Sequence, residues 1–383
     1  MLQIARRLSA HFILTPQGWL RGGILSFDDS GRLLDISLSD AVDREANVEF
    51  FDGALIPGLV NAHCHLELSY LRGKIGRGCG FAGFADAISR VRHEASEADR
   101  IAAADYWQSR MEHDGVVAVG DICNGNSTFG IKSHSPIHYY NFIEGFGLKT
   151  KDFRFLDRVK SEAEAVGLTA SVTPHATYSL QDASFRELAV AGERLSIHFM
   201  ESRAETELFQ SKGTLHERNV RLGVDVDFMR YGSPTGRILA SVLPEKELLL
   251  VHNTFITEQD IFAIQERFGE RVTWVVCPRS NDFIEGAFPP IDLLRRCGGR
   301  IAVGTDSLSS NERLSLIDEL KCFPSVPLEE RLRWATIGGA RALGLEDRIG
   351  SFEVGKTPAA VLLSGIAWSG MDLLPGASTQ RIL

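Results

Sequence analysis

From about residue 55 onward, this chain contains eight short apolar runs, each of which ends in a polar or ionisable residue. The runs are 54–61, 116–121, 139–144, 169–174, 195–198, 248–252, 272–277 and 301–305. Helical stretches lie between several of them, as in 258–268, where Ile261, Ile264 and Phe268 recur at helical spacing. Continuous apolar runs are typical of parallel strands that are buried on both faces. Eight such β-then-α units predict an α/β fold, a TIM-like (β/α)₈ barrel over residues 55–344.

A doubly wound open sheet is the alternative for the same alternation of strands and helices. The first strand is not followed by a Gly-x-Gly-x-x-Gly motif at the start of a helix, which weakens the dinucleotide-binding form of that fold. The chain has 383 residues and 44% hydrophobic content, enough for one large barrel and a smaller second domain.

The two ends of the chain have a different pattern from the middle. Near the N-terminus, short apolar stretches at 12–14, 23–25 and 33–36 are separated by turn-forming segments rich in Pro, Gly and Asp. Near the C-terminus, the turn-like segment 349–356 leads into a strand-like segment at 359–363. If these strands pair, residues 1–54 and 345–383 form a small discontinuous β-sandwich domain, with the barrel inserted between its halves.

The charge, the cysteines and the apolar content of the chain indicate which kinds of molecule it binds and in which compartment it works. The net charge of −9 disfavours nucleic acid, because no basic field would attract phosphates. The six cysteines are scattered without a Cys-x-x-Cys pair, which argues against a disulfide framework and suits a reducing compartment. No segment approaches the ~20 apolar residues of a membrane span, and no export signal is evident. We therefore expect a cytoplasmic protein that acts on a small molecule. Its oligomeric state stays open, with a homodimer among the alternatives.

Five side chains that can bind a metal stand at the ends of these runs. His63 and His65 follow the first run, His198 ends the fifth, His252 ends the sixth and Asp306 follows the eighth. The C-terminal ends of barrel strands meet at one face, and residues two apart in an extended strand point to the same side. Imidazoles with a carboxylate suit one divalent cation, Zn²⁺ first, with Fe²⁺ and Mn²⁺ as alternatives. Taken singly, each histidine could be a core residue and Asp306 a helix cap.

Glu201 lies three residues after His198, just past the end of the fifth run. This position can bring its carboxylate beside the attacking water without making it a metal ligand. A glutamate there would take a proton from the water and deliver it to the leaving nitrogen. The alternative is a glutamate in the first turn of a helix, where the helix dipole favours negative charge.

Several segments together resemble the amidohydrolase superfamily. Segment 56–67, which contains His63-Cys64-His65, resembles the first-strand signature of that superfamily. Similar segments follow at 173–179, 198–201, 251–253, 277–281 and 304–307. The tail 349–356 resembles the closing β-sandwich segment, although Thr357-Pro358-Ala359-Ala360 replaces the usual acidic continuation. The resemblance covers nearly the whole chain and implies a hydrolase that acts on C–N bonds other than peptide bonds.

The resemblance also implies roles for individual residues. It implies that the metal ligands are His63, His65, His198 and Asp306, with Asp306 serving as a base as well. Glu201 would be the proton shuttle, and His252 would polarise the attacking water or the substrate. Members with two metal ions carry a carboxylated lysine on strand four, but 169–175 contains no lysine, so one metal ion is expected.

Four further residues are predicted to bind the substrate: His175, Arg279, Glu67 and Asn281. For His175 the alternative is a buried core histidine, and for Arg279 it is a solvated or helix-capping arginine. An arginine that faces the site would suit an anionic group of the substrate.

Within the superfamily, the resemblance is to deaminases of aminated heterocycles. Arg279 and the long loop at 68–80 favour the group that acts on 6-aminodeoxyfutalosine in menaquinone synthesis. Alternatives are deaminases of guanine, methylthioadenosine or S-adenosylhomocysteine, hydrolases of an amide, cyclic imide or aryl chloride, and a non-catalytic ligand-binding relative. The ligand set together with Glu201 argues against the last. Zinc deaminases that edit nucleic acids are excluded because their Pro-Cys-x-x-Cys pair is missing.

Overall fold

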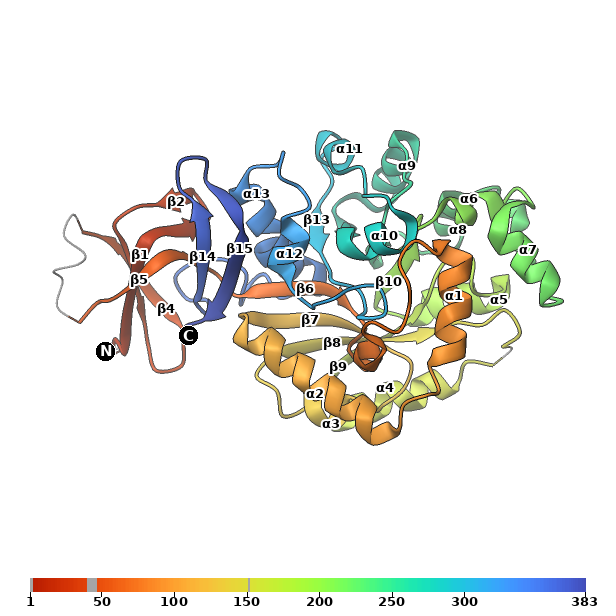
Figure 1. Ribbon diagram of the computed structural model, residues 1–383, viewed down its shortest axis with the longest axis horizontal. Helices are drawn as coiled ribbons and strands as arrows, with labels where there is room; N and C mark the ends of the chain where they lie inside the picture. Colours follow the sequence, from red (N-terminus) through yellow and green to blue (C-terminus); the bar gives the residue numbers. More distant parts are fainter. Residues whose placement is uncertain (1–2, 40–46, 151) are drawn as a thin grey trace.

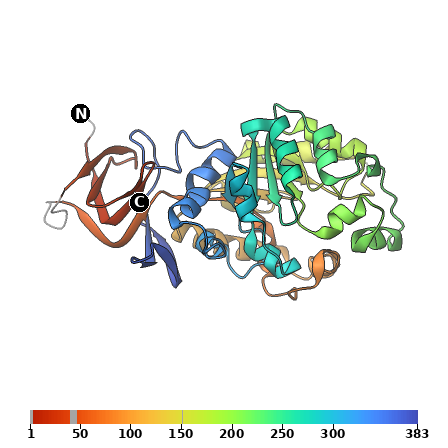
Figure 2. The ribbon, with the colours of Figure 1, turned by 90° about the horizontal axis from the view of Figure 1, so that it is seen from above.

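The computed structural model describes residues 3–39, 47–150 and 152–383. Residues 1–2 and 40–46 of the predicted terminal domain, and residue 151 of the predicted barrel, lie outside the described part. The molecule is elongated, with the strands of both termini at one end and a larger barrel with its helices at the other (Figure 1). The view from above shows the same division, with both chain ends on the smaller part (Figure 2).

Within the described ranges, the barrel consists of two four-stranded sheets whose strands all run parallel. The first sheet contains β6 (Leu59–Cys64), β7 (Val116–Cys123), β8 (His138–Gly145) and β9 (Thr169–Pro174). The second contains β10 (Arg194–Phe199), β11 (Glu247–His252), β12 (Val272–Val276) and β13 (Ile301–Val303). The predicted (β/α)₈ barrel is confirmed.

The two sheets meet along the β6/β13 seam and the β9/β10 seam. At the β6/β13 seam, the backbone pairing is a single parallel bridge, Cys64 with Asp306. Below this bridge, side chains make the connection: Asn61 Nδ2 donates to Thr305 Oγ1 at 2.8 Å, and the Thr305 amide donates to Asn61 Oδ1 at 3.2 Å. The seam is therefore closed by backbone bonds only at its C-terminal end.

The β9/β10 seam is built in the same way. Its parallel bridge joins Ala176 to His198. Thr173 Oγ1 then donates to the carbonyl oxygen of Ser196 at 3.0 Å and accepts from the Ser196 amide at 3.0 Å. At this seam, Thr173 satisfies backbone groups of Ser196 that face a buried interface. At the β6/β13 seam, the Asn61 side chain adds to the bond from the Thr305 amide to the His63 carbonyl oxygen at 3.0 Å.

Helices follow the strands and cover the outside of the barrel (Figures 1 and 2). The α-helices are α1 (Gly80–Val91), α2 (Glu97–His113), α3 (Phe129–Lys132), α4 (Phe155–Ala165), α5 (Asp182–Ala191), α6 (Arg203–Leu208), α7 (Gly213–Arg221), α8 (Pro234–Ser241), α9 (Glu258–Phe268), α10 (Pro278–Glu285), α11 (Ile291–Arg296), α12 (Leu316–Leu320), α13 (Leu328–Arg333) and α14 (Gly339–Leu343). Shorter helical segments are η2 (Leu66–Leu71), η3 (Met229–Tyr231), η4 (Gly269–Arg271) and η5 (Trp334–Gly338). Among the described residues, no helix combines the length and apolar character that a bilayer span requires.

Strands from both termini form a second, seven-stranded sheet within the described ranges. Its strands are β1 (Arg6–Thr15), β2 (Gly18–Leu20), β3 (Gly23–Phe27), β4 (Leu33–Leu38), β5 (Glu49–Ile56), β14 (Val361–Ala367) and β15 (Asp372–Arg381). β14 pairs antiparallel with β5, which joins the two ends of the chain. Leu8, Leu25, Phe27, Leu55 and Phe352 belong to a separate hydrophobic cluster there. The predicted pairing of the two termini is confirmed.

The first predicted strand, 54–61, is in fact two strands. β5 continues to Ile56 in the terminal sheet, and β6 begins at Leu59 in the barrel. Pro57 lacks the N–H that a ladder needs, and a Cβ on Gly58 would lie 2.5 Å from Val117. The chain therefore changes sheets at these two residues. We propose them, rather than position 54, as the boundary between the terminal domain and the barrel.

Candidate metal and active site

The predicted metal-binding side chains all lie at the C-terminal ends of barrel strands. His63 is in β6 with His65 directly after it, His198 is in β10, His252 ends β11 and Asp306 follows β13. His252 and Asp306 have φ angles of 82° and 55°, a left-handed conformation that is uncommon for residues other than glycine. Such backbone strain clusters at functional sites, where it redirects a side chain.

The four predicted ligands converge on one point. The Nε2 atom of His65 lies 3.4 Å from Nε2 of His198 and 3.5 Å from Oδ1 of Asp306. Oδ1 of Asp306 also lies 3.9 Å from Nε2 of His63. Ligand atoms of His63, His65 and Asp306 lie within 4.8 Å of one another, and so do those of His63, His198 and His252. The two groups share His63, so the structure brings all five side chains together.

The donor set fits a divalent cation. Nε2 of His63 is buried and has no hydrogen-bond partner among the described residues, as expected for an atom that is meant to hold a metal. Burial lowers the pKa of His63 and His198 well below its ordinary value, so both rings are neutral and keep a lone pair for coordination. Neutral imidazoles with one carboxylate are typical zinc ligands.

Neighbouring side chains hold the ligands in place. Ser280 Oγ donates to Oδ2 of Asp306 at 2.5 Å, and Ser310 Oγ donates to the same oxygen at 3.2 Å. Nδ1 of His198 donates to the carbonyl oxygen of His175 at 2.9 Å. Such bonds fix the orientation of a ligand and leave its other donor atom for the metal.

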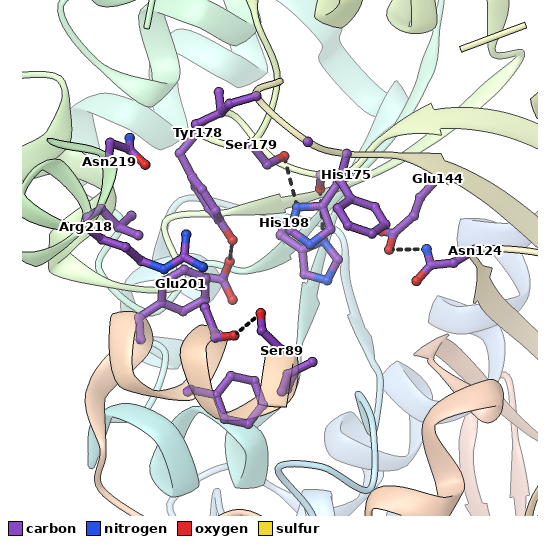
Figure 3. Close-up of a pocket in the computed structure, with 18 of the residues that line it drawn as sticks. Ser89, Asn124, Glu144, His175, Tyr178, Ser179, His198, Glu201, Arg218 and Asn219 are labelled. Atoms are coloured by element: carbon purple, nitrogen blue, oxygen red, sulfur yellow. Dashed lines mark hydrogen bonds between the residues drawn. The ribbon is translucent and has the colours of Figure 1, made fainter. Parts of the chain in front are cut away.

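Glu201 lies beside this cluster and is itself held by a hydrogen bond. The hydroxyl of Tyr178 donates to Oε1 of Glu201 (Figure 3). Oε2 of Glu201 lies 3.5 Å from Nε2 of His252. Burial raises the pKa of Glu201 well above its ordinary value. The carboxyl group can therefore carry a proton at neutral pH, which a proton shuttle requires.

Asn281 lies behind His252 and does not line the cavity described below. Nδ2 of Asn281 is 3.1 Å from Nδ1 of His252. With the amide donating, the imidazole proton sits on Nε2, on the side of Glu201. Burial lowers the pKa of His252 to about 4, so the ring is neutral and can donate from Nε2. The structure thus places Asn281 as an orienting residue.

A cavity of about 510 Å³ opens over the cluster, a size typical of small-molecule sites. His65, His198, His252, Asp306 and Glu201 line it. Apolar side chains from α1, α6, α7 and α10 form much of its wall, among them Phe81, Phe84, Ile88, Leu208, Leu215, Leu222 and Ile284. The predicted metal ligands therefore face a largely apolar chamber.

Of the four predicted substrate-binding residues, His175 lines this cavity. Its ring stacks on His198, with centroids 4.4 Å apart. Glu67 lies one step back: its carboxylate accepts from the amide of Asn124 at 3.1 Å, and Asn124 Nδ2 donates to Glu144 Oε1 at 2.6 Å. Figure 3 shows Glu144 and Asn124 on the opposite side of the stacked imidazoles from Glu201. Glu144, rather than Glu67, lines the cavity.

Arg279 is also outside the lining of the cavity. Its Nε donates to Asn311 Oδ1 at 3.0 Å, and its Nη2 lies 3.6 Å from Glu312 Oε2. Arg279 is in the first turn of α10, whose inner face carries the buried Ser280 and Asn281. Contact between Arg279 and the substrate therefore stays a prediction, and the contacts with Asn311 and Glu312 agree with the alternative of a partly solvated arginine.

Three residues of the site were missed from the sequence. Glu144 ends the third predicted strand, so the rule that selected His198 and His252 would have found it as well. Tyr178 lies in the segment 173–179 that carries part of the resemblance. Arg92 lines the cavity from the end of α1, and no motif marks it. Its guanidinium makes no hydrogen bond or ion pair with the residues that the structure describes.

Comparisons with known proteins agree with this geometry. A 5-methylthioadenosine/S-adenosylhomocysteine deaminase of Desulforudis audaxviator is 27% identical over 341 residues, which are 80% of this chain and 72% of the relative. An aminodeoxyfutalosine deaminase of Nitratiruptor sp. is 27% identical over 372 residues, which are 90% of this chain and 87% of the relative.

Among solved structures, Helicobacter pylori aminofutalosine deaminase in complex with methylthio-coformycin superposes with a TM-score of 0.82 at 24% identity, covering 94% of this chain and 92% of that one. An adenosine deaminase from Xanthomonas campestris with bound zinc gives a TM-score of 0.74 at 23% identity, covering 97% and 87%. At these identities, the two structures show that the fold is shared.

A match to a protein-family model shows the family to which this chain belongs. The model of the amidohydrolase family matches residues 54–375, which include the whole barrel and every predicted metal ligand. The match confirms the predicted superfamily and the predicted class, a hydrolase that acts on C–N bonds other than peptide bonds. With its barrel, its cluster of histidines and this match in agreement, the chain belongs to the amidohydrolase family.

Proposed function

We propose that this protein is a metal-dependent deaminase that removes the amino group of an adenosine-like nucleoside by hydrolysis and releases ammonia. One observation carries the proposal: His63, His65, His198 and Asp306 converge within reach of one cation, and Glu201 is buried beside them at the base of the cavity. The names of the relatives from Desulforudis audaxviator and Nitratiruptor support a nucleoside substrate.

The residues present fit one divalent cation, and we propose His63, His65, His198 and Asp306 as its ligands. Zinc is the first candidate because of the donor set, with Fe²⁺ and Mn²⁺ as alternatives. The cation would supply Lewis acidity, which makes water a competent nucleophile at neutral pH.

The remaining steps fall to the side chains of this chain. Asp306 accepts a proton from the attacking water, and His252 donates from Nε2 to the oxygen that enters the ring carbon. Glu201, held by Tyr178, delivers a proton to the amino nitrogen so that it leaves as ammonia. The apolar wall of the cavity keeps bulk water away from these transfers.

Within this class we propose 6-aminodeoxyfutalosine as the first substrate to test. The Nitratiruptor relative and the Helicobacter pylori structure support it by name. The cavity also offers Arg92, a cation without a partner among the described residues, which suits an anionic group on the substrate. Methylthioadenosine, S-adenosylhomocysteine and guanine are the alternatives, followed by an amide or an aryl chloride.

The test is a panel of purines, adenosine derivatives including 6-aminodeoxyfutalosine, and N-acyl amino acids. Ammonia release and the change in purine absorbance are recorded for the zinc-loaded protein. Release of ammonia from nucleosides supports the proposal, and turnover of N-acyl amino acids alone would contradict it.

The role of Glu201 is tested by Glu201→Gln, which keeps the shape of the side chain but cannot carry the proton. We expect kcat to fall by about 10²- to 10⁴-fold, the usual contribution of a positioned acid or base, while zinc content stays the same. The matched control is Glu207→Gln in α6, which lies outside the cavity lining. Normal turnover in Glu201→Gln would contradict the assignment.

A further inference from the structure

His65 differs from the other proposed ligands in how it is held. Nδ1 of His198 donates to a backbone carbonyl, and Oδ2 of Asp306 accepts from two serines. Nδ1 of His65, in contrast, is buried and has no hydrogen-bond partner among the described residues. Metal-binding histidines are almost always oriented by a bond at the second ring nitrogen. The orientation of the His65 ring must therefore be set in another way.

The backbone directly after His65 carries such a restraint. The amide of Leu66 donates to Oδ1 of Asp121 at 2.8 Å. Leu66 is the first residue of η2, and the preceding His65 provides no side-chain cap for this N–H. Asp121 lies on β7 directly beside Cys64, which precedes His65. One carboxylate oxygen therefore fixes the turn on which His65 stands.

A lysine accompanies this buried carboxylate. Nζ of Lys132, the last residue of α3, lies 2.5 Å from Oδ2 of Asp121, and both side chains have no exposed area. Nζ also donates to Asn141 Oδ1 at 2.8 Å. A carboxylate in the dry interior of a barrel needs a cation beside it to remain ionised. Oδ1 of Asp121 thus accepts from the Leu66 amide, while Oδ2 faces Lys132 and also accepts from the Cys123 thiol at 3.8 Å.

A second contact holds the same turn. The carboxylate of Glu67 accepts from the amide of Asn124, just beyond the end of β7, at 3.1 Å. Leu66 and Glu67 are therefore both tied to the C-terminal end of β7. The turn after His65 is held by hydrogen bonds at two consecutive residues, whereas Nδ1 of the His65 ring has no hydrogen-bond partner among the described residues.

We propose that Asp121 and Lys132 are positioning residues of the metal site: Asp121 fixes the turn that aims His65, and Lys132 holds the Asp121 carboxylate in the orientation that accepts from the Leu66 amide. The side chains of Asp121 and Lys132 do not line the cavity. Neither residue is a proposed metal ligand. The inference rests on the metal site of the proposed function and is independent of which substrate is used.

Two double variants separate positioning from simple stability. Asp121→Asn with Lys132→Met removes both charges but leaves an acceptor for the Leu66 amide, whereas Asp121→Leu with Lys132→Met removes the acceptor too. Neither pair leaves a charge at these two positions. We expect the first pair to bind zinc within about threefold of wild type, because a neutral replacement of a buried ion pair is tolerated. We expect the second to bind zinc about 10- to 100-fold more weakly.

Zinc affinity is measured by competition with a chelator on metal-free protein, so no substrate is needed. The visible spectrum of the cobalt-loaded protein is a second readout, since it reports the geometry around the metal. It should match wild type in the Asp121→Asn pair and change in the Asp121→Leu pair. Equal zinc affinity and equal spectra in the two pairs would overturn the role of Asp121.

The role of Lys132 is tested by the single variant Lys132→Met, which leaves Asp121 without its cation. We expect weakened zinc binding that is restored when Asp121→Asn is added. Failure of this rescue would overturn the part assigned to Lys132. As a control, Arg331→Met breaks the ion pair between the buried Arg331 and the partly exposed Asp372, and it should lower the melting temperature without changing zinc affinity.

A failure of this inference can be distinguished from a failure of the proposed function. If wild type binds zinc but deaminates no nucleoside, the proposed function fails while the affinities still decide this inference. If wild type takes up no divalent cation, the metal site fails and this inference fails with it.

Discussion

The two seams of the barrel are closed in the same way but carry different parts of the site. At each seam, one parallel bridge joins the strand ends, and polar side chains replace the backbone ladder below it. The β6/β13 seam carries His63, His65 and Asp306, including the only carboxylate among the four proposed ligands. The β9/β10 seam carries His198 together with His175, whose ring lines the cavity.

This difference assigns a distinct task to each seam. The β6/β13 seam holds most of the cation's ligands. The β9/β10 seam contributes one ligand and, through the carbonyl oxygen of His175, fixes that ligand's orientation. The cation would therefore join the two half-barrels at the points where their sheets lack a continuous ladder.

The largest effect is expected at the β6/β13 seam, in Asp306→Ala. The variant loses the carboxylate ligand and the proposed base at once. We expect zinc affinity to fall by more than the ~10- to 100-fold typical of a lost outer partner, and kcat to fall by at least about 10³-fold. Zinc titration and single-turnover kinetics measure the two effects separately.

His175→Ala is the matched variant at the β9/β10 seam. The backbone carbonyl that holds His198 survives this substitution, so zinc affinity should stay the same while KM rises. If His175→Ala released the metal as readily as Asp306→Ala, the division of tasks between the seams would be wrong.

Much of this arrangement could be predicted from the sequence, since strand ends are marked by simple chemistry. Apolar runs that close on a histidine or a carboxylate located the barrel strands and placed His63, His65, His198, His252 and Asp306 at one face. The same rule applied to the run 139–144 would have found Glu144, which now lies in the cavity wall.

The differences between prediction and structure have physical causes. The run 54–61 contains Pro57-Gly58, a turn signal, and the chain changes from one sheet to the other at these two residues. Arg279 was chosen for its charge, whereas it is Ser280 and Asn281 of the same helix that are buried. Contacts between distant elements, such as Tyr178 with Glu201, depend on the closed barrel and leave no local pattern.

A moderate effect is expected on stability when the metal is removed. A ligand that is present at about 1,000 times its Kd stabilises the folded state by about 4 kcal/mol. His198→Ala removes the one proposed ligand on the β9/β10 seam. If zinc then binds about 100-fold more weakly, its stabilisation of the folded state at the same zinc concentration falls to about 1.4 kcal/mol. Thermal unfolding with and without zinc measures this stabilisation in wild type and in His198→Ala. Equal stabilisation by zinc in the two proteins would show that the cation does not join the seams.

The smallest effects are expected from the side chains that close the seams below the bridges. Asn61→Ala removes the donor to the Thr305 hydroxyl and one of two acceptors of the Thr305 amide, which keeps the His63 carbonyl oxygen at 3.0 Å. Thr173→Val leaves the Ser196 amide without its side-chain acceptor. Each should lower the free energy of unfolding by about 1–3 kcal/mol, the cost of an unsatisfied buried polar group. Denaturant unfolding measures this loss.

Zinc titration then separates the two variants. Thr305 precedes Asp306 directly, so Asn61→Ala should also weaken zinc binding. Thr173 is bonded to Ser196, which lies two residues before His198 and whose hydroxyl is 3.5 Å from Nδ1 of His63. This connection to a proposed ligand is less direct, so Thr173→Val should weaken zinc binding less than Asn61→Ala does. Equal losses of zinc affinity in both variants would mean that the seams support the metal site alike, and that their different ligand content does not reflect a difference in how they are built.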